Sequence, residues 1–274
     1  NPLVAFLDSD DEWLPHKTDL QRRLMTRLPE ILFCFSETRH ELGSKKTMNR
    51  AAAHHLHTRR LGIRLLGPGV PFSSLAQLCD DCEDFPVHVG DMYASLIEGP
   101  AVWCTTAMVR SAPGRPRIYF PEDISYSEDW EYFSELARQG PAAFMDRELA
   151  IMHIGHGSPQ LIDSGGVYRA ETRMTVLQRV WGNDPEFLRS EPEAYHSALK
   201  QLRVMRVRRL VLAGDKEEAR VQLRLLKEHH ILLRFLNWMP TKILLLGTQI
   251  LWRPTLHAVQ SALSWDLHVT RPRH

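Results

Sequence analysis

The stretch PLVAFLDSDDEWLP, residues 2–15, decides the fold class, because an apolar run changes within it into a cluster of acids. Every residue from 3 to 7 is apolar, and three aspartates and a glutamate follow between positions 8 and 12. Such an apolar run predicts a short buried strand, parallel to its neighbours and central in a sheet. Like carboxylates repel one another, so the cluster needs solvent or a cation beside it.

The spacing of Asp8 and Asp10 suits a metal ion. One residue separates them, so both side chains point to the same side of an extended backbone. Paired carboxylate oxygens suit Mg²⁺ or Mn²⁺, and such an ion can neutralise a diphosphate leaving group. Two other interpretations stay open: a phosphatase of the haloacid dehalogenase type, and a solvated turn that caps a helix beginning near Pro15. An EF-hand loop does not fit, because Trp13 occupies the position of its glycine.

The composition is that of an ordinary globular protein. The chain has 274 residues, 43% of them apolar and 24% charged, and a net charge of +1 argues against nucleic acid as a partner. Four cysteines are too few for a disulfide scaffold and fit a reduced, cytoplasmic setting. The sequence shows no signal peptide and begins inside an apparent strand without Met, so we expect it to be part of a longer chain.

Strands and helices alternate over the first part of the chain, which predicts an α/β fold with a mixed sheet flanked by helices. Residues 42–87 are poorly periodic and are expected to be an insertion or loop region with short helices. The predicted strands are 3–7, 31–37, 101–109, 142–146 and 148–154, and the predicted helices are 15–28, 89–96 and 127–140.

After residue 163 the pattern predicts helices only, so we expect one domain over 1–163 and a helical tail over 164–274. The tail should contain a helix over 167–181 and a helical hairpin over about 193–230. Gly214 is expected to end the first helix of the hairpin and Asp215 to cap the second.

The last apolar stretch of the tail, residues 231–260, is interrupted by charges and proline, so it does not predict a membrane span. Two interpretations stay open for it. It could lie in a membrane interface at the cytoplasmic face, with Trp238 and Trp252 as anchors, or it could pack against the catalytic domain.

A second acidic cluster lies in SEDWEYF, residues 127–133. Ser127 suits a helix N-cap, and Glu128 and Asp129 would fill the first turn. An acid at this place can act as a general base if it faces the crevice of the sheet. Acids in a first turn also stabilise the helix dipole without any catalytic role, and the residues alone leave both interpretations open.

Four segments, in order FLDSDDEWLPHKTDLQ, WCTTAMVRS, SEDWEYFSELARQG and ELAIMHIGHGS, resemble the GT-A glycosyltransferases of family 2. These inverting enzymes use nucleotide-sugar donors and have a Rossmann-like sheet. Their pattern is an apolar strand ending in Asp-x-Asp, with Trp and Pro-x-Lys after it, a strand ending in Arg, and Glu-Asp-x-Glu-aromatic on a helix. The resemblance covers roughly residues 1–160. The family's first half, which carries the nucleotide-base pocket, has no counterpart here.

The resemblance implies a role for each matching residue. Asp10 would be the direct ligand of Mn²⁺ or Mg²⁺, and Asp8 would contact the metal or the ribose of the donor. Asp129 would be the catalytic base that deprotonates the acceptor hydroxyl, and Glu128 would line the sugar site. The remaining residues implied at the donor and acceptor sites are Trp103, Thr105 and His156, with His153 as the rival of His156.

The implied activity is transfer of a sugar from a nucleoside-diphosphate sugar to a hydroxyl acceptor, by in-line displacement with inversion. The acceptor would be a saccharide or a lipid-linked molecule, as in polysaccharide biosynthesis of the bacterial kind. The alternative is a non-catalytic interaction module in which the helical C-terminal region binds a partner.

Cys79 and Cys82 have the spacing of half a zinc site. The sequence shows no second pair of cysteines, and His88 is the only nitrogen ligand nearby in the sequence. A structural zinc needs four ligands, so the sequence does not favour a zinc site here. A thioredoxin-like redox pair is disfavoured as well, because no suitable strand precedes it. The HHLH segment at 54–57 is expected to be an exposed polar turn or helix.

Overall fold

The computed structural model describes residues 3–42, 46–48, 66–111, 118–154 and 166–225. The chain divides into two compact units. An α/β unit comprises Asn1–Asp123 and Glu128–Ser158, and a helical unit comprises Ile124–Ser127 and Pro159–His274. The predicted boundary at residue 163 falls outside the described residues and stays a prediction.

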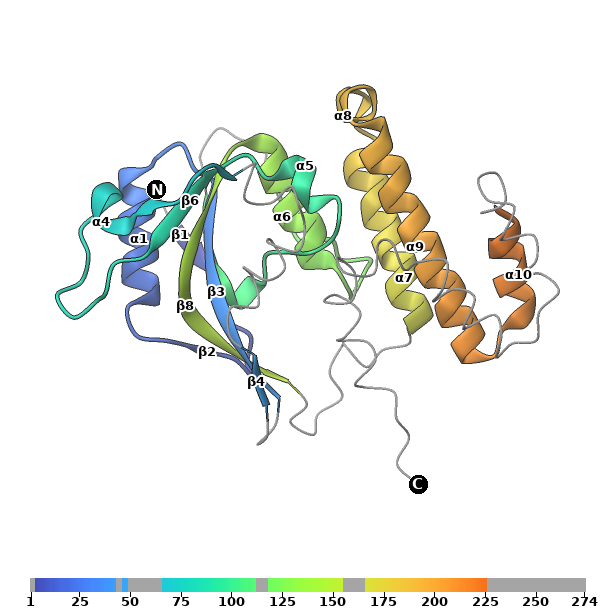
Figure 1. Ribbon diagram of the computed structural model, residues 1–274, viewed down its shortest axis with the longest axis horizontal. Helices are drawn as coiled ribbons and strands as arrows, with labels where there is room; N and C mark the ends of the chain where they lie inside the picture. Colours follow the sequence, from blue (N-terminus) through green and yellow to red (C-terminus); the bar gives the residue numbers. More distant parts are fainter. Residues whose placement is uncertain (1–2, 43–45, 49–65, 112–117, 155–165, 226–274) are drawn as a thin grey trace. The chain divides into compact units, whose positions relative to one another are not determined.

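The α/β unit is built on an eight-stranded mixed sheet, so the predicted fold class, α/β with a mixed sheet flanked by helices, is confirmed (Figure 1). Along the sheet the strands follow the order β1-β7-β3-β8-β6-β5, with β2 paired to β8 and β4 paired to β3. The strands are β1 Leu3–Ala5, β2 Glu12–Trp13, β3 Phe33–Leu42, β4 Lys46–Met48, β5 Val70–Pro71, β6 Pro86–Gly90, β7 Ala107–Arg110 and β8 Ala142–Ile154.

The long parallel pair β3 and β8 forms the middle of the sheet (Figure 1). The prediction of two strands at 142–146 and 148–154 was wrong, because they are one strand with a bulge. The register passes from Ser36 opposite Met145 to Glu37 opposite Glu148. The polar residues of this bulge interrupt the apolar pattern, although the backbone continues as a strand.

The prediction that the first strand is parallel and central was wrong, because β1 lies at one end of the described sheet and pairs antiparallel with β7. Leu3 and Ala5 pack against the core, whereas Val4 is 41% exposed on the other face. An apolar run therefore does not require burial on both faces. Since β7 is antiparallel to both β1 and β3, β1 nevertheless runs in the same direction as β3 and β8.

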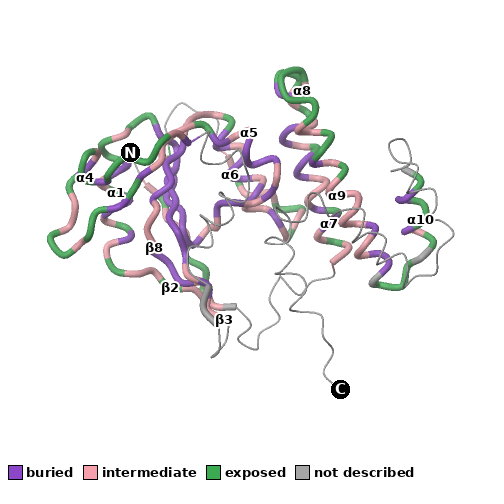
Figure 2. The backbone as a smooth tube through the Cα atoms, in the orientation of Figure 1, coloured by how far each residue is buried: buried purple, intermediate pink, exposed green. Residues whose placement is uncertain are grey.

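Helices cover both faces of the sheet, with α1 Lys17–Arg27 on one face and α6 Glu128–Gln139 on the other (Figure 1). The middle of the sheet between them, around β3 and β8, is largely buried (Figure 2). Side chains of β3 alternate between the two layers. Cys34 belongs to the core cluster that includes the buried residues of α1, and Phe33 contacts Phe133 of α6 with ring centroids 5.5 Å apart.

The region predicted as an insertion, residues 42–87, contains α4 Phe72–Leu75, strands β4 and β5, and the first two residues of β6. The predicted helix at 89–96 was wrong in its first half: β6 includes Val89, and α5 is limited to Tyr93–Leu96. The predicted strand at 101–109 was wrong up to residue 106: residues 101–103 have no regular structure, Cys104–Thr106 form a 3-10 turn, and the strand, β7, begins at Ala107. In the first case pairing in the sheet, and in the second a tight turn, overrides the secondary structure that the local residues favour.

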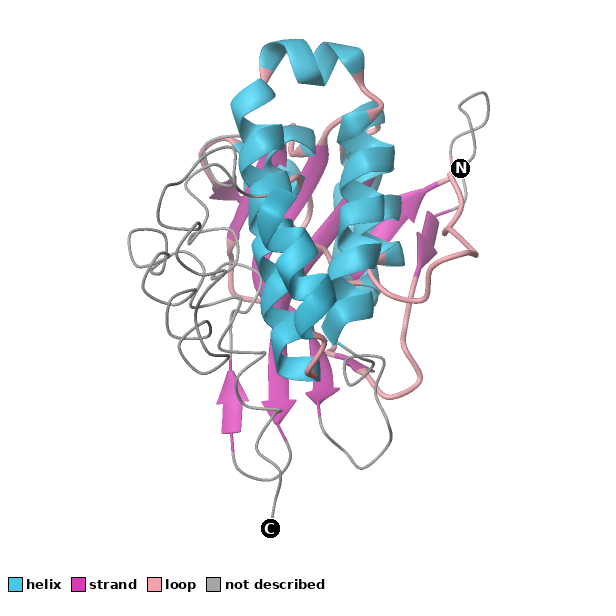
Figure 3. Cartoon of the chain, turned by 90° about the vertical axis from the view of Figure 1, so that its right-hand side faces the viewer, coloured by secondary structure: helices cyan, strands magenta, loops and turns pink. Residues whose placement is uncertain are grey.

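The helical unit contains no strand among its described residues (Figure 3). Its elements are α7 Gly166–Leu177, a π-helical turn Gln178–Gly182, α8 Pro185–Ser190, α9 Pro192–Ala213 and α10 Lys216–Leu225. The predicted turn of the hairpin is confirmed. Gly214 has a left-handed φ of 84° and ends α9, and the Asp215 carboxylate accepts the Glu218 N–H at 3.1 Å.

No helix within the described residues is both long and apolar enough to cross a membrane. The terminal apolar stretch, 231–260, lies outside the described residues, so its membrane contact stays a prediction.

Candidate functional site

The acidic tip, residues 8–12, follows β1 and is held by backbone hydrogen bonds. The Asp11 N–H donates to the Asp8 carbonyl at 3.1 Å and closes a turn. Glu12 and Trp13 then pair antiparallel with Ile151 and Ala150 of β8. The tip is therefore fixed at both ends, although it is a loop.

A chain of polar contacts ties Trp13 to the helix and strand behind it. The indole N–H of Trp13 donates to the Thr105 carbonyl at 3.0 Å. The ammonium of Lys17, which is 1% exposed, lies 4.6 Å from the centre of the Trp13 ring and donates to Gln21 at 2.8 Å. Gln21 in turn donates to the Thr106 carbonyl at 2.8 Å. Trp13 and Lys17, the Trp and Lys of the glycosyltransferase-like motif, thus have structural roles that support the tip.

The carboxylates of the tip repel one another. Although Asp8 lies exposed at the surface, partial desolvation of its carboxyl and the charge of Asp10 raise its pKa. Burial raises the pKa of Asp11 to about 6, and the charges of Asp8 and Asp10 add to that rise. A hydrogen bond from the His153 N–H and a side-chain contact with Thr105 oppose it in part. The tip therefore holds negative charge at a cost that a bound cation would remove.

His153 lies against the tip, although the resemblance implied it only as a rival of His156. Its N–H donates to the Asp11 carboxylate at 3.2 Å, and its Nε2 lies 3.0 Å from a Glu12 carboxylate oxygen. Its Nδ1 lies 3.7 Å from Glu41. His156 lies outside the described residues. His153 could be placed at the tip only from the pairing of its strand, β8, with Glu12. The sequence alone does not reveal this pairing.

The second acidic cluster begins α6 as predicted, but not with the predicted cap. Ser127 has a left-handed φ of 64°, and its hydroxyl makes no hydrogen bond with a described residue. The Asp129 carboxylate accepts the Trp130 N–H at 2.7 Å instead. Trp130 is buried, and its indole N–H donates to the Leu96 carbonyl at 2.6 Å. This contact anchors the first turn and orients Asp129.

Cys104 connects the two acidic clusters. Burial raises the pKa of its thiol, and the negative charges of Asp129, Asp8 and Glu128 raise it further. Charges act strongly only over short distances, because solvent and salt screen them. The charges of three carboxylates from two distant segments therefore act on one thiol, in the turn that precedes β7, which indicates that Asp8, Glu128 and Asp129 lie near it.

The residues beside Cys104 are those predicted for the acceptor site. Trp103 is half-buried, and its ring lies 5.2 Å from the ring of the buried His40. Thr105 is fully buried, and its carbonyl receives the Trp13 indole. Thr105 therefore acts as a support for the tip, whereas Trp103 has surface left for a ligand.

Asp8 and Asp10 are both exposed. Their oxygen donors fit Mg²⁺ or Mn²⁺, which keep several waters or phosphate oxygens as further ligands. No third His, Cys, Asp or Glu of the described part of the chain joins them in a tight cluster. A pocket of about 590 Å³ lies elsewhere and contains none of the predicted site residues. It is lined by Leu3, Thr18, Asp19, Arg22, Thr26 and Met108.

No protein-family model matches the chain, and a search of curated proteins gives no match.

Proposed function

We propose that the α/β unit transfers a sugar from a nucleoside-diphosphate sugar to a hydroxyl acceptor, with inversion at the anomeric carbon. The observation that supports this is that Asp8 of the first acidic cluster and Glu128 and Asp129 of the second, distant in sequence, all raise the pKa of the same Cys104 thiol. Metal-assisted displacement needs carboxylates for a cation and another carboxylate for a proton on one surface. The order of the motifs resembling family 2 glycosyltransferases supports the same assignment.

In this mechanism the residues of the chain bind, orient and accept a proton. Asp10 and Asp8 would hold Mn²⁺ or Mg²⁺, which when bound stabilises the charge of the departing nucleoside diphosphate. Asp129, oriented by the Trp130 N–H, accepts the proton of the acceptor hydroxyl. Trp103 offers an aromatic surface beside these acids, and Glu128 lines the sugar site.

The test is the thermal stability of the protein with Mn²⁺, with a nucleoside diphosphate, and with both together. A site that binds both should be stabilised only weakly by either alone. At about 100-fold above the dissociation constant, binding adds about 2.7 kcal/mol, which raises Tm by roughly 5–10 °C for a protein of this size.

Asp10→Asn should abolish the joint shift, whereas Glu30→Gln, which removes an exposed carboxylate from another loop, should preserve it. A joint shift that persists in Asp10→Asn would contradict the assignment. If Mn²⁺ and a panel of nucleoside diphosphates leave Tm unchanged, the interaction-module alternative is favoured instead.

A further inference from the structure

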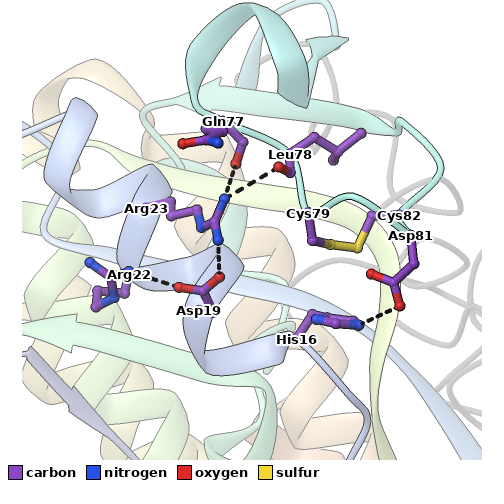
Figure 4. Close-up of polar contacts among 9 residues, drawn as sticks. All are labelled: His16, Asp19, Arg22, Arg23, Gln77, Leu78, Cys79, Asp81 and Cys82. Atoms are coloured by element: carbon purple, nitrogen blue, oxygen red, sulfur yellow. Dashed lines mark hydrogen bonds and ion pairs between the residues drawn. A yellow bond between two sulfur atoms is a disulfide. The ribbon is translucent and has the colours of Figure 1, made fainter.

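A second group of ligating side chains lies away from the acidic tip, in the same unit. It consists of His16, Cys79, Asp81 and Cys82, whose ligand atoms all lie within 4.8 Å of one another (Figure 4). His16 precedes α1, and the other three residues lie in the loop between α4 and β6. We propose that these four side chains form a structural Zn²⁺ site when the cysteines are reduced.

The distance between His16 and Asp81 suits tetrahedral zinc, whereas the two sulfurs, joined by a disulfide in the structure, must separate before they can bind a metal. Bonds of about 2.3 Å to sulfur and 2.0–2.1 Å to nitrogen or oxygen place neighbouring ligand atoms roughly 3.3–3.8 Å apart. The Nε2 of His16 lies 3.2 Å from a carboxylate oxygen of Asp81. Two thiolates, an imidazole and a carboxylate are ligands that zinc accepts, and the thiolates disfavour Mg²⁺ and Mn²⁺. The site is therefore chemically distinct from the acidic tip.

The loop that carries the cysteines is fixed on both sides. Its turn is closed by the Cys82 N–H, which donates to the Cys79 carbonyl at 3.1 Å. Before the turn, the Arg23 guanidinium of α1 donates to the carbonyls of Gln77 and Leu78, each at 3.2 Å (Figure 4). After the turn, Arg147 donates to the Glu83 carbonyl at 2.7 Å.

His16 is also held in an unusual conformation. Its φ is 69°, in the left-handed region that residues other than glycine adopt rarely and at a cost. Asp19 of the first turn of α1 positions Arg23 of the second turn with an ion pair of 2.6 Å, so the candidate ligand and the anchor of the loop both lie at the N-terminal end of α1. Strained backbone at such a position is expected where a side chain must be aimed at a ligand.

Zinc binding and the disulfide exclude each other. Cys79 and Cys82 are joined by a disulfide in the structure. A dithiol reductant supplies two electrons and two protons, breaks the S–S bond, gives two thiols, and is itself oxidised to a disulfide. Each thiol then loses one proton when its sulfur binds Zn²⁺. In the zinc form the metal replaces the Cys79–Cys82 cross-link within the loop and also joins the loop to His16 at the start of α1.

The test uses the full chain, treated with a dithiol reductant, freed of excess reductant and titrated with Zn²⁺ or with Co²⁺ as a spectroscopic substitute. We expect one tightly bound zinc per chain. We also expect an intense visible cobalt spectrum of tetrahedral type, with a thiolate-to-cobalt charge-transfer band. Zinc should raise Tm by several degrees.

The variants have matched controls. Cys79→Ser with Cys82→Ser should abolish the charge-transfer band and the bound zinc, whereas Cys104→Ser should keep both. Asp81→Asn should weaken zinc binding by at least about tenfold, and Asp80→Asn, one residue earlier, should not. His16→Ala should weaken zinc binding at least as much as Asp81→Asn does.

Three outcomes would overturn the proposal. In one, the reduced protein binds no zinc, which would make the cysteines a redox pair only. In another, zinc remains in the double cysteine variant, as it would if the HHLH segment at 54–57 held the metal. In the third, zinc binding needs the cysteines but is unchanged in both His16→Ala and Asp81→Asn. None of these outcomes bears on Asp10, so the proposed transferase activity is tested separately.

Discussion

Residues 8–12 of the α/β unit gather carboxylates whose charges help to raise the pKa of Asp8 and Asp11, whereas the helical unit pairs its charges across helices. In the helical unit, Arg206 of α9 lies 2.9 Å from Glu171 of α7 and 3.2 Å from Glu218 of α10. The guanidinium thus links three helices over the small core around Val207 and Leu210.

The difference separates charges that stabilise the fold from charges that destabilise it and that we propose to bind a cation. Opposite charges shared among three helices stabilise their packing, if only modestly. Like charges crowded at the tip lower stability, so their retention fits a ligand that compensates them. Substitutions in the two regions should therefore have opposite consequences, as the following predictions specify.

The largest effect is expected for Asp129→Asn. General-base help contributes about 10²–10⁴-fold to a rate, so transfer should fall by that factor while the fold is preserved. The rate is measured with each donor of a panel of nucleoside-diphosphate sugars that supports turnover. Glu131→Gln, in the same first turn, is the matched control. A fall of less than about tenfold would remove Asp129 from the role of base.

Truncating one buried tryptophan in each unit should destabilise mainly that unit. Trp130 is 1% exposed in the α/β unit and Trp181 is 0% exposed in the helical unit. Replacement of either by Ala should cost about 3–5 kcal/mol. Urea unfolding followed by hydrogen exchange should show loss of protection in the unit that carries the substitution. Equal loss in both units for either variant would show that the two unfold as one.

Arg206→Met should lower the free energy of unfolding of the helical unit by about 1 kcal/mol, because it leaves Glu171 and Glu218 without their shared cation. Methionine keeps the apolar stem of the side chain, so the change reports on charge. Arg224→Met, at an exposed position of α10, should cost less. An unchanged free energy for Arg206→Met would mean that the ion pairs contribute nothing measurable.

The smallest effect should have the opposite sign. Because the folded-state pKa of Asp11 is raised to about 6, its contribution to stability is full below about pH 4 and is lost as pH rises to about 6. Asp11→Asn should therefore stabilise the protein by on the order of 1 kcal/mol at pH 7, after allowance for solvent screening. Chemical denaturation at pH 4 and pH 7 measures this. A gain that is equal at both pH values would exclude the carboxylate's ionisation as its cause.

Local features could be predicted from the sequence and non-local ones could not. The hairpin turn at Gly214 was predicted correctly because a left-handed C-cap and an Asp N-cap are specified by neighbouring residues. The predicted central position of β1 was wrong, because a strand pairs with segments that are distant in the sequence, and the local residues do not identify those segments. The contacts of His153 and His16 depend on residues more than 60 positions away in the sequence, so spacing could not reveal them.

The central pair of strands also sets the order of events when the chain is made. The Thr38 hydroxyl donates to the Ala150 carbonyl, and the two residues are 112 positions apart. At roughly 5–20 residues per second, β3 waits on the order of ten seconds for β8 to be synthesised. During this time β3 lacks its parallel partner, and its buried Phe33 and Phe35 lack the cover that β8 later supplies. The nascent chain should therefore depend on chaperones until the sheet closes.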